Sequence, residues 1–184
     1  MDRMYAPWRL AYVHGAREEI IEAPSGCIFC DYVLPRGQPV STSSDPSRRL
    51  FDQRRLVVTV REHALVVLNK FPYGNGHVMV VPRSHTEHLD ALDDVAFSAV
   101  QALLKETLVA VREVYRPDGM NVGMNIGAAA GAGIAAHCHW HVLPRWKGDV
   151  NFLPVFADVK VLNEALTDTW TRLAAKLRSP DEDV

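Results

Sequence analysis

The sequence predicts an α+β protein, built on one antiparallel five-stranded sheet with two main helices. Three observations lead to this fold class. Three β-branched runs come first, a segment with helical periodicity follows, and two more extended runs precede a second helical segment. The turns between the first three runs are too short for the crossover that parallel strands require. Strands and helices segregated along a chain in this way are typical of the α+β class.

The first three strands are predicted at residues 56–60 (LVVTV), 64–69 (ALVVLN) and 77–82 (HVMVVP). Each run is rich in β-branched residues, and the turns REH and PYGNG separate the runs. We therefore expect them to form an antiparallel meander.

A helix is predicted to begin at Asp93 and Asp94, because carboxylates there favour the unpaired N–H groups of a first turn. Its apolar residues recur at helical spacing: Val100, Leu103, Leu104, Leu108, Val111 and Val114. The RPDG sequence at residues 116–119 is expected to end the helix.

The remaining elements are two strands, at residues 120–126 (MNVGMNI) and 137–145 (HCHWHVLPR), and a helix over residues 159–177. A loop of small residues, GAAAGAGIAA, lies between the two strands. We divide the chain into an N-terminal extension (1–55) with a Cys-x-x-Cys pair and a flexible loop, the sheet domain (56–178), and an acidic tail (179–184).

Composition excludes several classes of function. The 184 residues include 20 Lys+Arg and 22 Asp+Glu, and this near-neutral balance argues against a nucleic-acid partner. No apolar run approaches the roughly 20 residues needed to span a bilayer, so no membrane partner is expected. The three cysteines, Cys27, Cys30 and Cys138, suit a reducing cytoplasm better than a disulfide framework.

Three histidines, His137, His139 and His141, alternate along the last predicted strand and should share one of its faces. The residues between them are Cys138, Trp140 and Val142, which should point into a core. Buried imidazoles need hydrogen-bond partners, so three in register indicate a site rather than packing.

Two chemistries fit this row of histidines. A His-x-His pair with a distant ligand can hold a catalytic zinc ion, and an imidazole can act as a nucleophile at phosphorus. The loop glycines Gly127, Gly131 and Gly133 could bring backbone N–H groups close to a phosphate, and Arg145 and Lys147 add cations. The residues around the row therefore favour phosphoryl chemistry.

The stretch from His137 to Arg145 resembles the signature of the histidine triad superfamily, in which three histidines alternate with apolar residues. Residues 69–82 (NKFPYGNGHVMVVP) look like its nucleotide-contacting strand pair, and residues 121–127 look like the strand before its triad. The continuation PRWKGDVNF at 144–152, with an N-terminal Trp8, Arg9 and Tyr12, looks most like the branch that cleaves diadenosine polyphosphates. The resemblance implies a homodimer with paired sheets and no organic cofactor.

The resemblance also implies roles for the histidines. His139 would attack the α-phosphorus, His141 would contact the α-phosphate oxygens, and His137 would lie near the bridging oxygen of the leaving group. His77, on the neighbouring strand, would support His139 from behind.

Nucleotide contacts follow from the same resemblance. Asn69 would hold the ribose hydroxyls, Asn125 would reach a phosphate or the leaving group, and Gly131 and Gly133 would bind phosphate through the loop. The alternative for both asparagines is turn capping. Gly133 stands where hydrolases of the family usually carry Gln, which leaves the second acceptor, water or phosphate, undecided and favours phosphate modestly.

The Cys27-x-x-Cys30 pair has the spacing of a zinc site, and some histidine triad proteins complete it with two histidines. The matching positions here are His85 and His137, which would give a structural Cys₂His₂ zinc site. The alternative is a pair of buried, reduced thiols. A zinc ligand at His137 would conflict with its role at the leaving group.

The sequence thus predicts a nucleotidyl hydrolase or transferase that cleaves dinucleoside polyphosphates, such as diadenosine tetraphosphate, through a nucleotidyl-histidine intermediate. The alternatives are a nucleoside phosphoramidate hydrolase and a nucleotide-binding signalling module. The presence of His139 argues against the signalling module, because binding alone needs no nucleophile.

Overall fold

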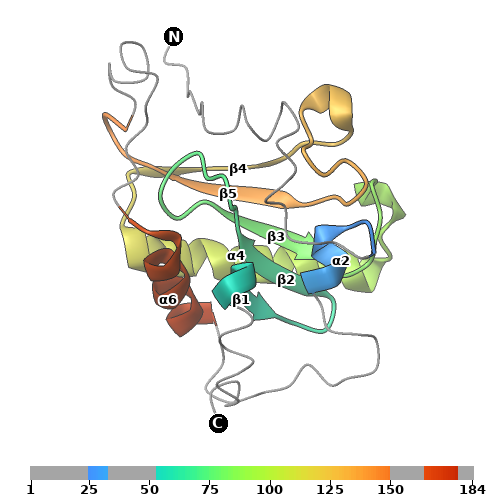
Figure 1. The fold of residues 1–184 in the computed structure, drawn as a ribbon, viewed down its shortest axis with the longest axis horizontal. Coiled ribbons are helices and arrows are strands. Elements are labelled where there is room, and N and C mark those ends of the chain that lie inside the picture. Colours follow the sequence, from blue (N-terminus) through green and yellow to red (C-terminus); the bar gives the residue numbers. More distant parts are fainter. Residues whose placement is uncertain (1–24, 33–52, 150–163, 178–184) are drawn as a thin grey trace.

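The structure of this chain is a computed structural model, and it describes residues 25–32, 53–149 and 164–177. Its centre is a five-stranded sheet in the order β1-β2-β3-β5-β4, with every neighbouring pair antiparallel (Figure 1). The strands are β1 (Val57–Val60), β2 (Ala64–Leu68), β3 (Val78–Pro82), β4 (Gly119–Met124) and β5 (Trp140–Arg145). The predicted fold class, the five strands and the meander of the first three are confirmed.

The two main predicted helices are present as α4 (Asp94–Tyr115) and α6 (Leu166–Leu177). The predicted range of the second helix was too long at its start, because residues 164 and 165 are not helical. The Asp93 side chain accepts a hydrogen bond from the N–H of Ala96 at 2.7 Å, so it caps α4 as the sequence indicates. The described residues also form short elements that were not predicted, among them α2 (Ile28–Tyr32), η2 (Leu89–Ala91) and η3 (Ala128–Ala130).

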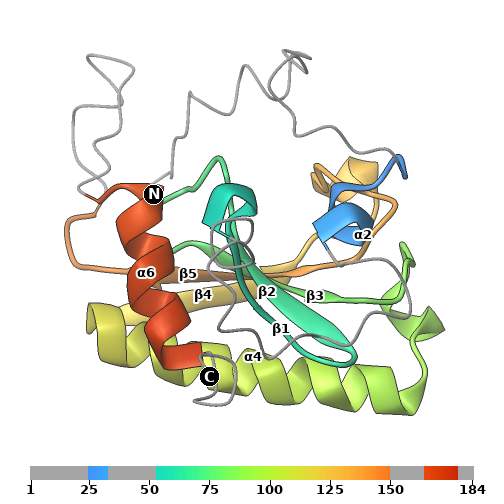
Figure 2. The ribbon, with the colours of Figure 1, turned by 60° about the horizontal axis from the view of Figure 1, so that its bottom comes forward.

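Helices cover both faces of the sheet (Figure 2). On one face, α4 and α6 pack on Val66, Val80 and Val142 in the larger core. On the other face, Phe29 of α2 packs with Leu65 and other residues in a smaller core. Successive side chains of β2 and β3 therefore enter the two cores in turn. This is why β1, β2 and β3 are buried along their whole length and consist almost entirely of apolar residues.

The strand that carries the histidines begins later than predicted, at Trp140 rather than at residue 137. Before it, the N–H of Cys138 donates to the carbonyl of Thr86 at 2.7 Å, so this backbone pairs with the segment that follows β3. Only His141 of the triad lies within β5. The small-residue loop before it contains η3 and otherwise matches the prediction.

Several predictions concern residues outside the described ranges. They are the N-terminal Trp8, Arg9 and Tyr12, the flexible loop, residues 150–152, the start of the last helix before residue 164, and the acidic tail. Within the described ranges, no helix combines the length and apolar character needed to cross a membrane.

Candidate active site and metal centre

The ring of His139 is 4 % exposed and is held by a backbone group. Its Nδ1 lies 2.8 Å from the carbonyl oxygen of His137. A carbonyl can only accept a hydrogen bond, so Nδ1 carries the proton and donates it. In the neutral ring, Nε2 is then the nitrogen with the lone pair, which is the form a nucleophilic imidazole needs.

His141 takes the opposite tautomer because of its neighbour, His77. The backbone N–H of Tyr73 donates to Nδ1 of His77 at 3.1 Å, so the proton of the neutral His77 ring is on Nε2. That Nε2 lies 3.0 Å from Nδ1 of His141 and donates to it. The proton of His141 is therefore on its own Nε2, where it can be donated to an anion.

Two neighbouring imidazoles thus present a lone pair and an N–H donor. The ring centroids of His139 and His141 are 4.9 Å apart with an interplanar angle of 73°. His77 was predicted to support His139, and the hydrogen bond described above directs it to His141. This arrangement can combine nucleophilic attack with stabilisation of charge on the attacked group.

His137 has both ring nitrogens directed at protein groups. Its Nε2 donates to the carbonyl oxygen of Pro82 at 2.8 Å, and its Nδ1 lies 3.3 Å from Sγ of Cys27. The residue is 1 % exposed. Burial lowers the pKa of His137 to about 4, so its ring is neutral at neutral pH and Nδ1 has a lone pair.

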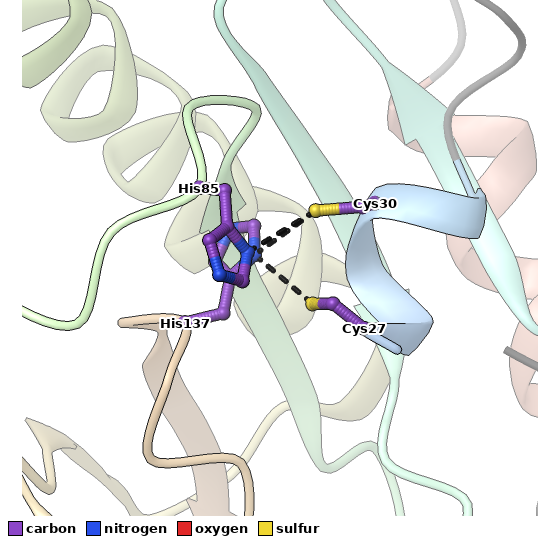
Figure 3. Close-up of side chains that lie close together, drawn as sticks. All are labelled: Cys27, Cys30, His85 and His137. Atoms are coloured by element: carbon purple, nitrogen blue, oxygen red, sulfur yellow. Dashed lines mark hydrogen bonds between the residues drawn. The ribbon is translucent and has the colours of Figure 1, made fainter. Parts of the chain in front are cut away.

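Figure 3 shows the four predicted zinc ligands together, although they come from three separate segments. Cys27 directly precedes α2 and Cys30 lies within it. His85 follows β3, and His137 precedes β5. Their ligand atoms all lie within 4.8 Å of one another. The structure therefore brings the whole predicted set to one place.

The distances suit a tetrahedral metal ion. Sγ of Cys30 lies 3.3 Å from Nδ1 of His85 and 3.7 Å from Nδ1 of His137. Zinc bonds of about 2.3 Å to sulfur and about 2.0–2.1 Å to nitrogen would separate such ligands by about 3.6 Å. The carbonyl of Pro82 orients the ring of His137, as outer partners of metal-bound histidines commonly do. Donor type, number and spacing all fit zinc.

The two predicted nucleotide-binding asparagines make local contacts. The side-chain oxygen of Asn69 accepts from the N–H of Phe71 at 2.9 Å, and Nδ2 of Asn125 donates to the carbonyl of Gly131 at 3.4 Å. These are the turn contacts that the alternative interpretation describes. Gly131 itself has a φ of 88° and ends η3, in a loop whose Gly133 is also exposed.

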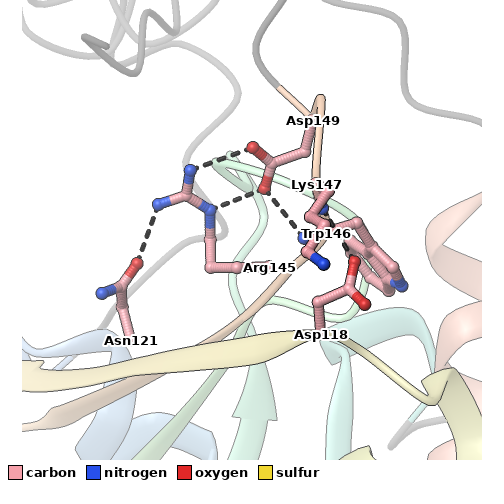
Figure 4. Close-up of polar contacts among 6 residues, drawn as sticks. All are labelled: Asp118, Asn121, Arg145, Trp146, Lys147 and Asp149. Carbon is pink, nitrogen blue, oxygen red and sulfur yellow. Dashed lines mark hydrogen bonds and ion pairs between the residues drawn. The ribbon is translucent and has the colours of Figure 1, made fainter. Parts of the chain in front are cut away.

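Arg145, which its position in the sequence suggested as a cation near phosphate, pairs with groups of the protein. Figure 4 shows its guanidinium paired with both carboxylate oxygens of Asp149, at 2.6 and 2.9 Å, and with the side-chain oxygen of Asn121 at 2.9 Å. The hydrogen bonds with Asp149 raise the pKa of Arg145. This cluster joins the ends of β4 and β5, and the backbone N–H of Lys147 adds a bond to Asp118 at 2.8 Å.

Phe29 was not among the predicted site residues. Its ring is fully buried, and its ring centroid lies 5.3 Å from that of His137 and 5.1 Å from that of His139. The only signal in the sequence was an aromatic residue between the two cysteines. The other unpredicted groups, the Pro82 carbonyl and the Tyr73 N–H, belong to the backbone and have no side-chain signature.

Comparison with known proteins is consistent with this geometry. The family model described as HIT domain matches residues 51–148. A curated relative from Mycobacterium tuberculosis, named AP-4-A phosphorylase, is 32% identical over 182 residues, covering 96% of this chain and 84% of the relative.

Solved structures show the same fold. A zinc-bound histidine triad family protein from Mycobacterium smegmatis superposes with a TM-score of 0.60 at 25% identity, covering 84% of this chain and 95% of that protein. A HIT family member from Bacillus subtilis has a TM-score of 0.52 at 25% identity, covering 67% of this chain and 75% of that protein.

Proposed function

This chain belongs to the HIT domain family of nucleotide-processing proteins, and on that premise we propose that it cleaves dinucleoside polyphosphates through a nucleotidyl intermediate on His139. The observation that carries the proposal is the pair of hydrogen bonds that select opposite tautomers at His139 and His141. The M. tuberculosis relative named AP-4-A phosphorylase supports diadenosine tetraphosphate as the substrate.

In the first step, the lone pair on Nε2 of His139 attacks the α-phosphorus. The N–P bond forms while the P–O bond to the rest of the polyphosphate breaks, and ATP leaves as an anion. Positive charge develops on the attacking ring, and the His137 carbonyl, which accepts the Nδ1–H, stabilises that charge. The Nε2–H of His141 donates to an α-phosphate oxygen.

In the second step, an acceptor oxygen attacks the same phosphorus and the P–N bond to His139 breaks. We propose inorganic phosphate as the acceptor, which gives ADP. Gly133 offers no side chain to orient water, whereas the exposed glycine-containing loop can approach an anion with its N–H groups. Asn69 and Asn125 would leave their local contacts to hold the ribose and a phosphate.

We further propose that zinc is held by Cys27, Cys30, His85 and His137. The ion would act as a structural cross-link between the N-terminal segment and the sheet. His137 is then a ligand and not a contact of the leaving group, because both of its ring nitrogens are directed at protein groups.

Purified protein should contain about one zinc ion per chain, and Cys27→Ser should lower both zinc content and thermal stability. Protein with reduced thiols, prepared without chelators and free of zinc, would contradict this assignment.

The test of the reaction is product analysis with diadenosine tetraphosphate, with and without inorganic phosphate. ATP and ADP formed only when phosphate is present support phosphorolysis. ATP and AMP formed at the same rate in both samples would show a hydrolase instead. Turnover of nucleoside phosphoramidates alone, or tight nucleotide binding without turnover, would overturn the proposed substrate.

The nucleophile is tested with His139→Ala. This variant should keep its fold and much of its nucleotide affinity while losing several orders of magnitude in turnover. His63→Ala is a matched control, because this half-buried imidazole lies on the turn between β1 and β2 beside Glu62. A His139→Ala variant with more than about a tenth of wild-type turnover would exclude the covalent mechanism.

A further inference from the structure

One short helix contributes to both the metal centre and the active site. The segment with α2 provides Cys27 and Cys30 to the four-residue metal cluster. Phe29, from the same turn, is fully buried, and its ring centroid lies 5.1 Å from that of His139. A neighbour of the nucleophile, Phe29, therefore lies between two candidate metal ligands within four residues of chain.

A second connection passes through His137. Its side chain faces the metal cluster, with Nδ1 at 3.3 Å from Sγ of Cys27. The backbone carbonyl of the same residue accepts a hydrogen bond from Nδ1 of His139, at an N···O distance of 2.8 Å. The position of the group that selects the tautomer of His139 is thus tied to the position of a metal ligand.

The ring of Phe29 joins these two connections. It contacts the ring of His137 edge-on, with a centroid distance of 5.3 Å and an interplanar angle of 78°. Its interplanar angle with the ring of His139 is 59°. A buried ring packed on two imidazoles restricts the rotation of both. If the carbonyl or the ring moved, the neutral His139 could adopt the tautomer with the proton on Nε2, which has no lone pair for attack.

We infer that the metal-binding segment positions the nucleophile: closure of the cluster formed by Cys27, Cys30, His85 and His137 holds the His137 carbonyl and the Phe29 ring against His139. Phe29 and His137 are positioning residues in this scheme. The inference rests on the proposed function for its kinetic consequence. The orientation and tautomer of His139 can be measured without any turnover.

The experiment compares zinc-loaded wild type with Phe29→Leu, which keeps an apolar side chain but removes the aromatic contact. Tyr32→Leu is the matched control, since it removes another buried ring from the same helix. The ring centroid of Tyr32 lies 6.3 Å from that of Phe29. Zinc content is measured for each protein. The imidazole ¹⁵N shifts of His139, assigned by comparison with His139→Ala, report its tautomer.

We expect Phe29→Leu to retain wild-type zinc content, to show a mixture of His139 tautomers, and to lose about 10- to 100-fold in kcat with little change in KM. Tyr32→Leu should leave the His139 signals and kcat near wild type. Removal of zinc from the wild type with a chelator should produce the same mixture of tautomers, and re-addition of zinc should reverse it.

Unchanged His139 signals in zinc-loaded Phe29→Leu and in the zinc-free wild type would overturn the inference, whatever the enzyme's activity. An equal effect of Tyr32→Leu would also overturn it, because the effect would then reflect loss of packing in general. If the wild type did not turn over the dinucleotide, the proposed function would fail while the ¹⁵N measurement would still decide the positioning role.

Discussion

At the scale of single residues, the reactivity of the triad depends on what each ring nitrogen faces. A backbone carbonyl selects the tautomer of His139, and it cannot donate a proton under any condition. The tautomer of His141 depends instead on His77, whose own tautomer is selected by the N–H of Tyr73. Substitution of His77 therefore removes the hydrogen-bond donor to His141, whereas no side-chain substitution removes the carbonyl that accepts from His139.

We predict that His77→Ala lowers kcat about 10- to 100-fold, the range seen when a residue that orients a functional group is removed. The loss arises because Nδ1 of His141 no longer accepts a hydrogen bond, so either tautomer of the ring can face the phosphate. His77→Gln, whose amide can donate to the same nitrogen, should recover part of the loss. Steady-state kinetics on both variants tests this, and equal losses in the two would contradict the role of the donor.

At the scale of elements, the turn between β2 and β3 places His77 and depends on Gly76. This glycine has a φ of +69°, and a Cβ at its position would lie 2.8 Å from Cε2 of Tyr115 and 3.0 Å from Cγ of Pro144. The Tyr115 ring cannot easily retreat, because its hydroxyl donates to Glu164 at 2.6 Å. The turn is thus packed against the end of α4.

We predict that Gly76→Ala is more destabilising than Gly148→Ala. Both glycines have positive φ, and an added Cβ at Gly148 would meet nothing within 4 Å. Each substitution should lower the free energy of unfolding by about 1–2 kcal/mol, because alanine is strained in the left-handed region. Gly76→Ala should lower it by about 1–3 kcal/mol more, because the added methyl group is overpacked. Chemical denaturation measures the difference. Equal losses would mean that the turn yields to the new methyl group.

The partly buried carboxylate of Glu164 joins α6 to α4. Glu164 accepts hydrogen bonds from Tyr115 at 2.6 Å, Thr169 at 2.8 Å and Arg172 at 2.5 Å. Burial by itself would raise the pKa of Glu164, but the hydrogen bonds from these three side chains outweigh burial and hold the pKa below its usual value of 4.5.

We predict that Glu164→Gln lowers the free energy of unfolding at pH 7 by about 1–3 kcal/mol, because charged hydrogen bonds are lost. The folded-state pKa of Glu164 is lowered, so its contribution is fully present above pH 4.5 and declines as the pH falls below that value. The stabilities of wild type and variant should therefore converge in acid. Denaturation curves at a series of pH values test this, and a constant difference would assign the effect to packing.

At the scale of the whole molecule, the expected homodimer remains a prediction. β4 is an edge strand, and Val122 in it is 42% exposed while Ile126 just beyond it is 46% exposed. An apolar edge of this kind invites pairing with another chain.

We predict that the protein has twice the chain mass in solution and that the double variant Val122→Asp, Ile126→Asp is monomeric, because burying two carboxylates would oppose association. Val95→Asp is the control, since this residue is 64% exposed on α4 and its substitution should leave the mass unchanged. Light scattering measures each mass. A wild-type monomer, or a double variant that remains dimeric, would contradict the prediction.

Features encoded over a few residues could be predicted from the sequence. The β-branched runs, the helical period and the Asp93 cap reflect local energetics, so the strands β1 to β3 and the helix α4 were located closely. The residue types and spacing of the triad and of the Cys-x-x-Cys pair likewise indicated phosphoryl chemistry and zinc ligands. The short helix α2 was missed because five residues have too little periodicity to recognise.

Only the tertiary structure decided which partner each of these residues faces. β5 inserts between β3 and β4, so His77 meets His141, while the chain before β5 directs the ring of His137 to the cysteines. Arg145 is likewise engaged by Asp149 and Asn121 rather than left for a phosphate. The physical reason is that a tautomer or an ion pair depends on groups brought together by long-range strand pairing, and no local period or spacing encodes that pairing.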